Sequence, residues 1–379
     1  MPSAKPSSKS PAKPQRYVII MAGGRGERFW PVSREKTPKQ LIRLLGDRSF
    51  LQQAVDRVRP VVPASHILVI TSAAQADEVR RQLPELPARN IVAEPVGRDT
   101  CAAVALGAAI VGARSPDAVM AVLPADHVIP EPARFQQVLS DALDLATAQP
   151  VVVTIGIQPN EPATGYGYIH TGKRIADLTC PTAFFNARKF VEKPSLERAI
   201  EYLATGNYRW NAGMFVWSFK TISQGLQTHQ PDMHAACLRW LQAAATSPAA
   251  LRKILAAEYP EIRKVSIDYA LLEKATNVVV ADGSFAWDDL GAWPALARHV
   301  PHDEAGNAAV GDLVQVDAAN NIVYDGRTQN RSLITLVGVQ DSIIVLTDDA
   351  VLVAARSEAQ KIKDLVRKLA LDPIHQRLV

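Results

Sequence analysis

The first half of the chain alternates short, wholly apolar runs with longer segments of helical character. The apolar runs occupy Tyr17–Ala22, Ile67–Thr71, Ile91–Ala93 and Val119–Leu123. A strand that is apolar on both sides must be covered by helices on both sides, which is typical of a parallel sheet. The sequence therefore predicts an α/β fold with a Rossmann-like, mostly parallel sheet flanked by helices. The expected helices are Phe50–Val58, Ala74–Leu83, Thr100–Ala113 and Phe135–Ala146, and a further strand is expected at Val151–Ile157.

Three parts with different patterns follow one another along the chain. Residues 1–15 are rich in Pro, Ser, Ala and Lys, a composition that predicts a disordered tail. Residues 16–300 carry the α/β pattern, with short strands expected at Phe184–Val191, Gly213–Trp217 and Asn277–Ala281. Residues 301–379 predict a small β-rich C-terminal domain that ends in a helix at Ser357–Leu371. The expected strands of that domain are Val310–Val316, Asn321–Tyr324, Leu333–Val339, Ser342–Leu346 and Ala350–Ala354.

Composition argues against several functional classes. The formal net charge of the 379 residues is +4, but residues 1–16 contain four basic residues and no acid. Setting those four aside leaves 38 Lys and Arg against 38 Asp and Glu, so net charge gives no support for nucleic-acid binding. The longest apolar run, Cys101–Ala113, is too short to span a bilayer. Three cysteines without paired spacing and a tail without a secretory apolar core lead us to expect a cytoplasmic protein.

The strand at Tyr17–Ala22 runs directly into a glycine-rich loop with several cations. The tetrapeptide Gly23–Gly26 can bring backbone N–H groups close to an anion, because glycine has no Cβ to obstruct the approach. The loop is not a Walker loop, and Phe29 stands where the dinucleotide fingerprint needs a glycine. Arg28 and Lys39, separated by stiff prolines, could converge on one anion. The sequence therefore predicts a polyphosphate site at this strand end.

The passage from Ala22 to Gln40 resembles the signature of the nucleotidyltransferases that make nucleotide sugars from a sugar 1-phosphate. Among these it is most similar to the mannose-1-phosphate guanylyltransferases, also called GDP-mannose pyrophosphorylases. The resemblance is close over roughly residues 15–300 and looser beyond them. Seven further motifs follow in the family's order, namely Glu94-Pro95 with Gly97–Thr100, Pro124–His127, Thr164–Ile169, Phe190–Pro194, Trp210–Phe215, Ser266–Tyr269 and Phe285–Trp293.

The resemblance implies a reaction without a covalent enzyme intermediate. An oxygen of α-D-mannose 1-phosphate attacks the α-phosphorus of GTP in line, pyrophosphate leaves, and GDP-mannose is formed. Catalysis then rests on positioning two anions and neutralising their charge. The implied partners are GTP and mannose 1-phosphate. The implied cofactor is Mg²⁺, which takes one or two carboxylates together with substrate phosphates.

The resemblance also assigns roles to individual residues. Arg28 is expected to stabilise the departing pyrophosphate, Lys39 to contact the triphosphate, and Lys193 to bind the sugar phosphate. Asp126 and Asp289 are the expected metal ligands and complete the catalytic set. The nucleotide is expected to bind at Ala22, Gly23, Gly24, Gly26, Glu94, Arg98, Asp99 and Thr100, although the family often has Asn where Asp99 stands. The sugar phosphate is expected to bind at Gly165, Tyr166, Glu192, Lys193, Asn211 and Asp268.

Taken singly, these residue types also have ordinary structural roles. Arg28 or Lys39 could pair with a neighbouring glutamate at the surface, as exposed charges often do. An aspartate at a strand end, such as Asp126, could be a cap or turn former. Glu192 and Lys193 could be a solvated charge pair before a proline turn.

Other functions remain open at this point. A UTP- or dTTP-using hexose-1-phosphate nucleotidyltransferase differs only in a few pocket contacts. A non-catalytic regulatory homologue would share the fold, but the five expected catalytic residues are all present. A nucleic-acid-binding function is supported by the basic tail alone. We further expect a homodimer formed through the C-terminal region, a single enzymatic activity, and no nucleic-acid or membrane partner.

Overall fold

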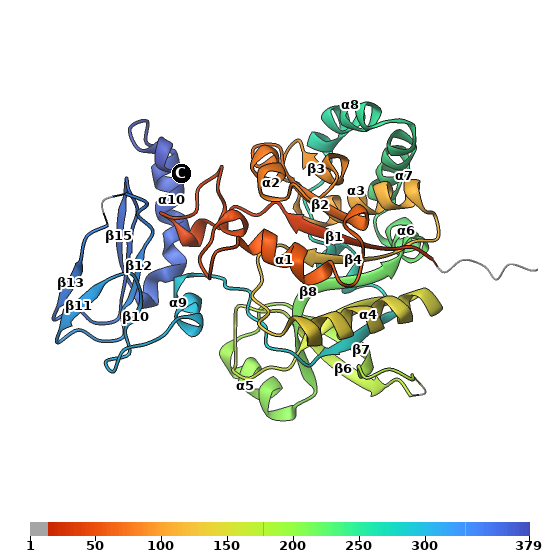
Figure 1. Ribbon diagram of the computed structural model, residues 1–379. Helices are drawn as coiled ribbons and strands as arrows, with labels where there is room; N and C mark the ends of the chain where they lie inside the picture. The colour runs from red at the N-terminus through yellow and green to blue at the C-terminus, as the bar shows by residue number, and fades with distance from the viewer. Residues whose placement is uncertain (1–13, 177, 330) are drawn as a thin grey trace, which may run out of the picture.

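The computed structural model describes residues 14–176, 178–329 and 331–379, so residues 1–13 of the expected tail lie outside the described residues. A nine-stranded sheet with the order β3-β2-β1-β4-β8-β5-β9-β7-β6 forms the centre of the protein (Figure 1). Its strands are β1 (Arg16–Ala22), β2 (Ile67–Ser72), β3 (Ile91–Glu94), β4 (Val119–Pro124), β5 (Val152–Ile157), β6 (Tyr168–Arg174), β7 (Phe184–Val191), β8 (Tyr208–Ser218) and β9 (Val278–Gly283).

The sheet has a parallel half and a mixed half. Strands β3, β2, β1 and β4 are all parallel, so their C-terminal ends meet at one edge. Strand β8 runs antiparallel to β4 and β5, and β7 runs antiparallel to β6 and β9, whereas β5 and β9 are parallel. Sequence reasoning did not anticipate β6, because its residues YIHTGKR include few apolar ones and its second half is exposed.

Helices cover both faces of the sheet, as the apolar strands require. In β1, Val18 and Ile20 face a core shared with α1 and α4, while Tyr17 and Ile19 face a core shared with α3 and α7. Figure 1 shows these helix pairs on opposite sides of the parallel strands. The helices are α1 (Phe50–Val58), α2 (Ala76–Gln82), α3 (Asp99–Arg114), α4 (Pro132–Ala148), α5 (Leu196–Thr205), α6 (Phe219–His229), α7 (Pro231–Thr246), α8 (Pro248–Glu258), α9 (Trp293–Leu296) and α10 (Ile362–Ala370).

The C-terminal region is a coil of short strands that ends in α10. Strands β10, β12 and β14 are parallel neighbours, β15 closes that sheet in antiparallel fashion, and β11 pairs with β13 in a second, two-stranded sheet. The chain alternates between the two sheets as it winds. The strands are β10 (Ala308–Val310), β11 (Leu313–Val316), β12 (Ile322–Asp325), β13 (Ile334–Val337), β14 (Ser342–Leu346) and β15 (Val351–Ala355). These observations confirm the α/β class and the β-rich region with a terminal helix, while the boundary at residue 300 stays a prediction.

Two elements of the C-terminal region differ from the sequence expectation. The single strand expected at Val310–Val316 is divided, because Gly311 adopts φ +126°, which turns the chain from one sheet to the other. The helix expected at Ser357–Leu371 is a 3₁₀ turn at Arg356–Lys361 followed by α10.

Buried polar side chains join successive turns of the coil. The Oδ1 atom of Asn307 accepts hydrogen bonds from the backbone and side-chain nitrogens of Asn321, at 3.0 and 2.9 Å. The side chain of Asn321 in turn donates to the carbonyl of Val339 (2.8 Å) and accepts from the backbone of Ser342 (3.0 Å). Both asparagines are buried, and their amides hydrogen-bond to backbone groups of neighbouring turns of the coil.

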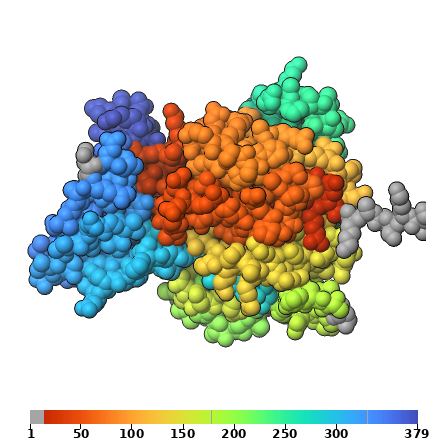
Figure 2. All heavy atoms as spheres, in the orientation of Figure 1, coloured from red at the N-terminus to blue at the C-terminus, as the bar shows by residue number. Residues whose placement is uncertain are grey.

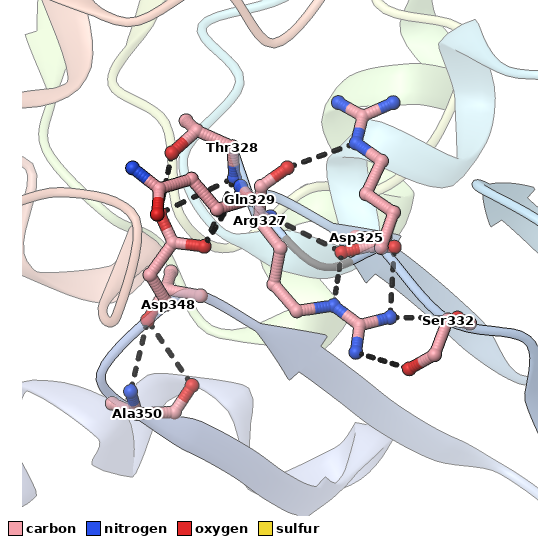
Figure 3. Close-up of polar contacts among 9 residues, drawn as sticks. Asp325, Arg327, Thr328, Gln329, Ser332, Asp348 and Ala350 are labelled. Atoms are coloured by element: carbon pink, nitrogen blue, oxygen red, sulfur yellow. Dashed lines mark hydrogen bonds and ion pairs between the residues drawn. The ribbon is translucent and has the colours of Figure 1, made fainter.

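The connection after β12 is fixed by two carboxylates (Figure 3). Asp325 accepts hydrogen bonds from the Arg327 guanidinium, which also donates to Ser332. Asp348, beyond β14, accepts from the hydroxyl of Thr328 and from the backbone of Gln329. The loop is therefore tied both to its own strand and to the neighbouring turn.

The coil packs against the glycine-rich loop region rather than standing apart. Phe29 and Trp30 from that region share a core with Ile343, Ile362 and Val366, and the Trp30 indole donates to the carbonyl of Leu378 (2.8 Å). Figure 2 shows the red-orange N-terminal segment in contact with the blue C-terminal region. Among the described residues, no helix has the length and apolar character needed to cross a bilayer.

Candidate active site

Side chains from the proline-containing segment that follows it fix the glycine-rich loop after β1. Gln40 is buried and donates through Nε2 to the carbonyls of Ala22 (2.8 Å) and Gly24 (2.9 Å). Ser33 donates to the carbonyl of Gly26 (2.7 Å). Gly26 has φ +62°, and a Cβ there would lie 2.5 Å from the Cβ of Lys39. Only glycine therefore allows this backbone shape and the close approach of Lys39.

Lys39 holds the two predicted metal ligands together. Its side chain is buried, and its Nζ lies 2.9 Å from Oδ2 of Asp126 and donates to the backbone carbonyl of Asp289 (2.6 Å). Burial acts to raise the pKa of Asp126, but the Lys39 ammonium outweighs it, with help from His127, so the pKa stays below its usual value. Lys39 was expected to contact the triphosphate; in the structure it lines the predicted phosphate site, but its charge is already paired.

A short backbone bridge explains how aspartates far apart in the sequence meet. Val128 and Asp288 exchange two antiparallel hydrogen bonds of 2.9 and 3.1 Å, which places the segment after β4 beside the Phe285–Trp293 motif. Asp289 is the carboxylate that reaches the site, where its Oδ1 accepts from the Tyr166 hydroxyl (2.9 Å). The carboxylate of Asp288 instead accepts hydrogen bonds from Arg298 and His299.

The phosphate cavity, as we call it, has a volume of about 430 Å³ and lies in front of these residues. Arg28 forms no ion pair with any described residue; it donates to the carbonyl of Gly291 (3.3 Å), and its buried Nε has no partner among the described residues. Burial lowers the pKa of His127 to about 4, so its imidazole is neutral near pH 7. The cavity is lined by Arg25, Gly26, Glu27, Arg28, Phe29, Lys39, Asp126, His127, Asp289, Gly291 and Lys363.

The nucleotide cavity, of about 370 Å³, contains most of the residues predicted for the nucleotide. Glu94 ends β3 as a buried carboxylate, and its Oε1 accepts from the Tyr259 hydroxyl. Burial raises the pKa of Glu94 to about 7, although the Tyr259 hydrogen bond opposes the rise. Ala22 does not line the cavity, because its side chain points into the core. The predicted residues that do line it are Gly23, Gly24, Glu94, Arg98, Asp99 and Thr100, while Gly26 lines the phosphate cavity.

The sugar cavity also has a volume of about 370 Å³, and its charged side chains contact one another. Lys193 pairs with the adjacent Glu192 at 2.6 Å, and that contact raises the pKa of Lys193. Asn211 donates to Asp268 (2.7 Å), whose pKa is raised by burial and by neighbouring acids. All six predicted sugar-phosphate residues line this cavity, namely Gly165, Tyr166, Glu192, Lys193, Asn211 and Asp268.

The three cavities adjoin one another. Pro124, Gly213 and Asp268 line both the nucleotide and the sugar cavities. His127 and Asp289 line both the phosphate and the sugar cavities. The arrangement is therefore one branched cleft at the C-terminal edge of the parallel strands, where ligands of such sheets bind.

Strained backbone conformations occur at three positions in or beside this cleft. Asp99 (φ 65°), Lys193 (φ 43°) and Leu290 (φ 45°) are three of the six described non-glycine residues with positive φ. Such conformations cost about 1–3 kcal/mol each and persist only where the surroundings enforce them. Each of the three residues lines a cavity or neighbours a cavity residue, so the fold holds these groups against their backbone preference.

Two residues of the site had no role predicted from the sequence. Trp287, within the Phe285–Trp293 motif, lines the sugar cavity and donates from Nε1 to Nδ1 of His127 (3.0 Å). Lys363 comes from the C-terminal helix and lines the phosphate cavity, although no motif includes it. Lys363 lies far from the loop in sequence, so no local pattern indicates that both line the same cavity.

The two predicted metal ligands suit a hard divalent cation. Asp126 and Asp289 supply carboxylate oxygens to one cavity, and no cluster of three or more His, Cys, Asp or Glu side chains suited to a metal occurs among the described residues. A pair of carboxylates without a complete protein cage is the pattern by which Mg²⁺ binds together with substrate phosphates. The donor set therefore fits a metal ion that arrives with the nucleotide.

Comparisons with known proteins identify the family. The nucleotidyl transferase family matches residues 17–306, and the mannoseP isomerase/GMP-like beta-helix domain matches residues 311–369. The chain is 36% identical to a mannose-1-phosphate guanylyltransferase of Escherichia coli, over 97% of this chain and 76% of that one. It is 37% identical to a mannose-1-phosphate guanylyltransferase of Sinorhizobium fredii, over 96% of this chain and 70% of that one.

Solved structures agree with the sequence comparison. The crystal structure of mannose-1-phosphate geranyltransferase from Thermus thermophilus has a TM-score of 0.80 and 32% identity, and the match covers 94% of this chain and 99% of that one. That of mannose-6-phosphate isomerase from Helicobacter pylori shares the fold, with a TM-score of 0.56 at 21% identity over 72% of this chain and 99% of that one. The chain therefore belongs to the mannose-1-phosphate guanylyltransferase family of nucleotidyltransferases.

Proposed function

We propose that this chain transfers the guanylyl group of GTP to mannose 1-phosphate and releases pyrophosphate. The single observation that carries the proposal is the branched cleft, whose three adjoining cavities are lined by most of the residues predicted for the nucleotide, the phosphates and the sugar. A transfer between two anions needs these groups side by side, because the attacking oxygen and the α-phosphorus must approach closely. The family assignment makes this the favoured reaction over transfer from other nucleotides.

The chain's own charges explain how two anions can approach. A phosphate oxygen of mannose 1-phosphate attacks the α-phosphorus of GTP, the bond to the β-phosphate breaks, and pyrophosphate leaves with the electron pair. Lys193 in the sugar cavity reduces the repulsion between the substrates, and Arg28 in the phosphate cavity stabilises the charge that develops on the leaving group. Lys39 acts indirectly, since its ion pair and hydrogen bond orient the segments of Asp126 and Asp289.

Nucleotidyltransferases of this family generally use a divalent metal ion, and we propose Mg²⁺ for this chain. Asp126 and Asp289, which both line the phosphate cavity, would hold it, and Asp289 also lines the sugar cavity. When bound, the ion would neutralise phosphate charge. Tyr166 fixes the Asp289 carboxylate by its hydrogen bond, so the protein's part is to present two oriented oxygen donors.

Glu94 offers a physical reason for the choice of guanine. Guanine presents two neighbouring donors, its N1–H and its amino group, and a carboxylate can accept from both. Uracil and thymine present a single N–H between two carbonyls. Their carbonyl oxygens would be repelled by the carboxylate. The buried Glu94 therefore favours guanine, since an unmatched acceptor in a desolvated site is costly.

A pyrophosphate-release assay with four nucleoside triphosphates and several hexose 1-phosphates tests the proposal. We expect the highest kcat/KM with GTP and mannose 1-phosphate in the presence of Mg²⁺, and GDP-mannose as the second product. Comparable rates with UTP or dTTP and glucose 1-phosphate would assign the chain to another specificity. The absence of turnover with every pair would favour a regulatory homologue.

We also propose that the protein forms a homodimer through its C-terminal region. Val316 of β11 and Val337 of β13 lie opposite each other in register, and both side chains are exposed. Exposed apolar side chains on adjacent strands favour contact with another surface. Light scattering of the full chain and of a Val316→Glu/Val337→Glu variant tests this: a monomeric wild type would refute the dimer, and a dimeric variant would place its interface elsewhere.

A further inference from the structure

We propose that Lys363 is a substrate-contacting residue that binds the two terminal phosphates of GTP and the pyrophosphate they become. The proposal rests on the proposed function, because it concerns the leaving group of that reaction. It assigns to the C-terminal region a direct part in the active site. The observation behind it is that Lys363, alone among the described residues of that region, lines the phosphate cavity.

The position of Lys363 is fixed by the buried residues beside it in α10. It lies in the first turn of α10, between Ile362 and Val366, whose side chains are buried. Those two residues share a core with Phe29, the neighbour of Arg28 in the loop after β1. Figure 1 shows α10 between the C-terminal strands and this N-terminal loop. The core that joins the two regions therefore brings Lys363 and Arg28 to the same cavity.

The charge balance of the cavity leaves Lys363 available for an anion. Its neighbours on the helix are committed, since Lys361 pairs with Glu358 and Arg367 with Asp364. Lys363 itself makes no ion pair with any residue in the described part of the chain, and it is only partly exposed. An ammonium in a concave site without a carboxylate partner favours binding of a phosphate, to which it donates charge-assisted hydrogen bonds.

Two other cations that line the cavity already have acidic partners, so they are less available to bind a phosphate than Lys363. Lys39 is paired with Asp126, and Arg25 is an exposed side chain near Glu35. Arg28 and Lys363 thus remain as the cations of this cavity without an acidic partner among the residues that the structure covers. Pyrophosphate carries several negative charges, so two such cations from different regions suit it better than one.

The location predicts which ligands depend on Lys363. GTP and pyrophosphate both contain the two phosphates that leave, whereas GDP-mannose contains neither. Lys363 should therefore affect pyrophosphate and leave the binding of GDP-mannose unchanged. A residue that only supports the fold would weaken both ligands together, so the split between them separates contact from structure.

Titration calorimetry with the full-length chain in Mg²⁺ tests the proposal. The variants are Lys363→Gln, Lys363→Ala and Lys363→Arg, with Lys368→Gln as a matched control on the exposed side of the same helix. We expect Lys363→Gln to raise the Kd of pyrophosphate about tenfold, as loss of one charge-assisted contact does. We expect Lys363→Arg to restore most of the affinity, the control to match wild type, and the Kd of GDP-mannose to change in none of them.

Two results would overturn the proposal. One is an unchanged Kd of pyrophosphate in Lys363→Gln, and the other is an equal loss for pyrophosphate and GDP-mannose. Circular dichroism verifies that each variant is folded, and if the alanine variant unfolds, the glutamine and arginine variants decide. A wild-type chain that binds pyrophosphate but forms no GDP-mannose would instead refute the proposed function, and the calorimetric comparison would still decide the role of Lys363.

Discussion

The phosphate and sugar cavities use lysine in opposite ways. Lys39 in the phosphate cavity is 4% exposed and is held by Asp126 and a backbone carbonyl. Lys193 in the sugar cavity has a side chain that is 63% exposed and pairs only with its neighbour Glu192 among the described residues. A desolvated, paired lysine fixes geometry, whereas an exposed one can turn toward an arriving ligand. We infer that the phosphate cavity sets the rate of transfer and the sugar cavity sets affinity.

The largest effect is expected from the two carboxylates of the phosphate cavity. Asp126→Asn and Asp289→Asn should each reduce kcat about 100-fold or more at saturating Mg²⁺, because each removes an anionic metal donor. The fold should be largely retained, as circular dichroism can verify. Steady-state pyrophosphate release gives kcat, and near-wild-type rates would remove these residues from the metal site.

Asp288→Asn is the matched control for these carboxylates. Asp288 is buried and accepts hydrogen bonds from Arg298 and His299, away from the phosphate cavity. Its loss should lower the free energy of unfolding by about 2 kcal/mol, since charge-assisted bonds of a buried group are broken. The loss of kcat in the folded fraction should be smaller than for Asp289→Asn. The reverse ranking would mean that Asp288 rather than Asp289 serves the reaction.

Gly26→Ala should have the next largest effect, because it displaces Lys39. The new Cβ would meet the Cβ of Lys39 at 2.5 Å and would require φ +62° of an alanine. We expect kcat to fall at least about tenfold and stability to fall by about 1–3 kcal/mol, measured by pyrophosphate release and urea unfolding. Gly24→Ala is the control for stability, because its Cβ would meet no atom within 4 Å. Equal stability loss in both variants would contradict the tight packing at Gly26.

A pH dependence is expected from Glu94 in the nucleotide cavity. Because burial raises its pKa to about 7, the carboxylate is ionised above pH 7 and protonated below it. Guanine binding needs the ionised form as acceptor, so the affinity for GDP-mannose should rise as the pH increases from about 6 to about 8 and level off above the pKa, by up to about tenfold. Calorimetry across this range measures it.

Glu94→Gln provides the control for the pH experiment. The amide cannot ionise, so the affinity of this variant should be lower and should no longer rise with pH. A wild-type affinity that is flat across the same pH range, or a variant with the same pH dependence as wild type, would show that Glu94 does not accept from the base.

The smallest effect is expected from Lys193, in keeping with its exposure. Lys193→Ala should raise the KM for mannose 1-phosphate by up to about tenfold and leave the KM for GTP unchanged. Lys189→Ala, which removes an exposed lysine from β7 outside the sugar cavity, should change neither value. Unchanged kinetics for both variants would remove Lys193 from the site, and a fall in kcat alone would erase the contrast with Lys39.

Much of the parallel half of the sheet could be predicted from the sequence. The strand at Tyr17–Ala22 was predictable because it is a short, unbroken apolar run, and the helix at Phe50–Val58 because its apolar positions recur at the helical period. Ser49 and Gln52 add a capping box that fixes where the helix begins. Parallel strands end at one edge, so the residues that follow β1, β3 and β4 had to lie near one another.

The contacts between distant segments could not be predicted. The bridge between Val128 and Asp288 has no local signal, yet it brings Asp289, and not Asp288, to the cavity that Asp126 also lines. The pairing of Lys39 with Asp126 joins two segments that are far apart in sequence, so no local pattern indicates it. Lys363 reaches the cavity only because α10 packs on Phe29, which sequence spacing cannot indicate.

A crystal structure of the protein with GDP-mannose tests most directly the claim that the three cavities form one site. The account predicts guanine against Glu94, the mannosyl phosphate beside Lys193, and Arg28 and Lys363 facing the space that pyrophosphate vacates. A product bound away from Asp126 and Asp289, or a mannose outside the sugar cavity, would contradict it.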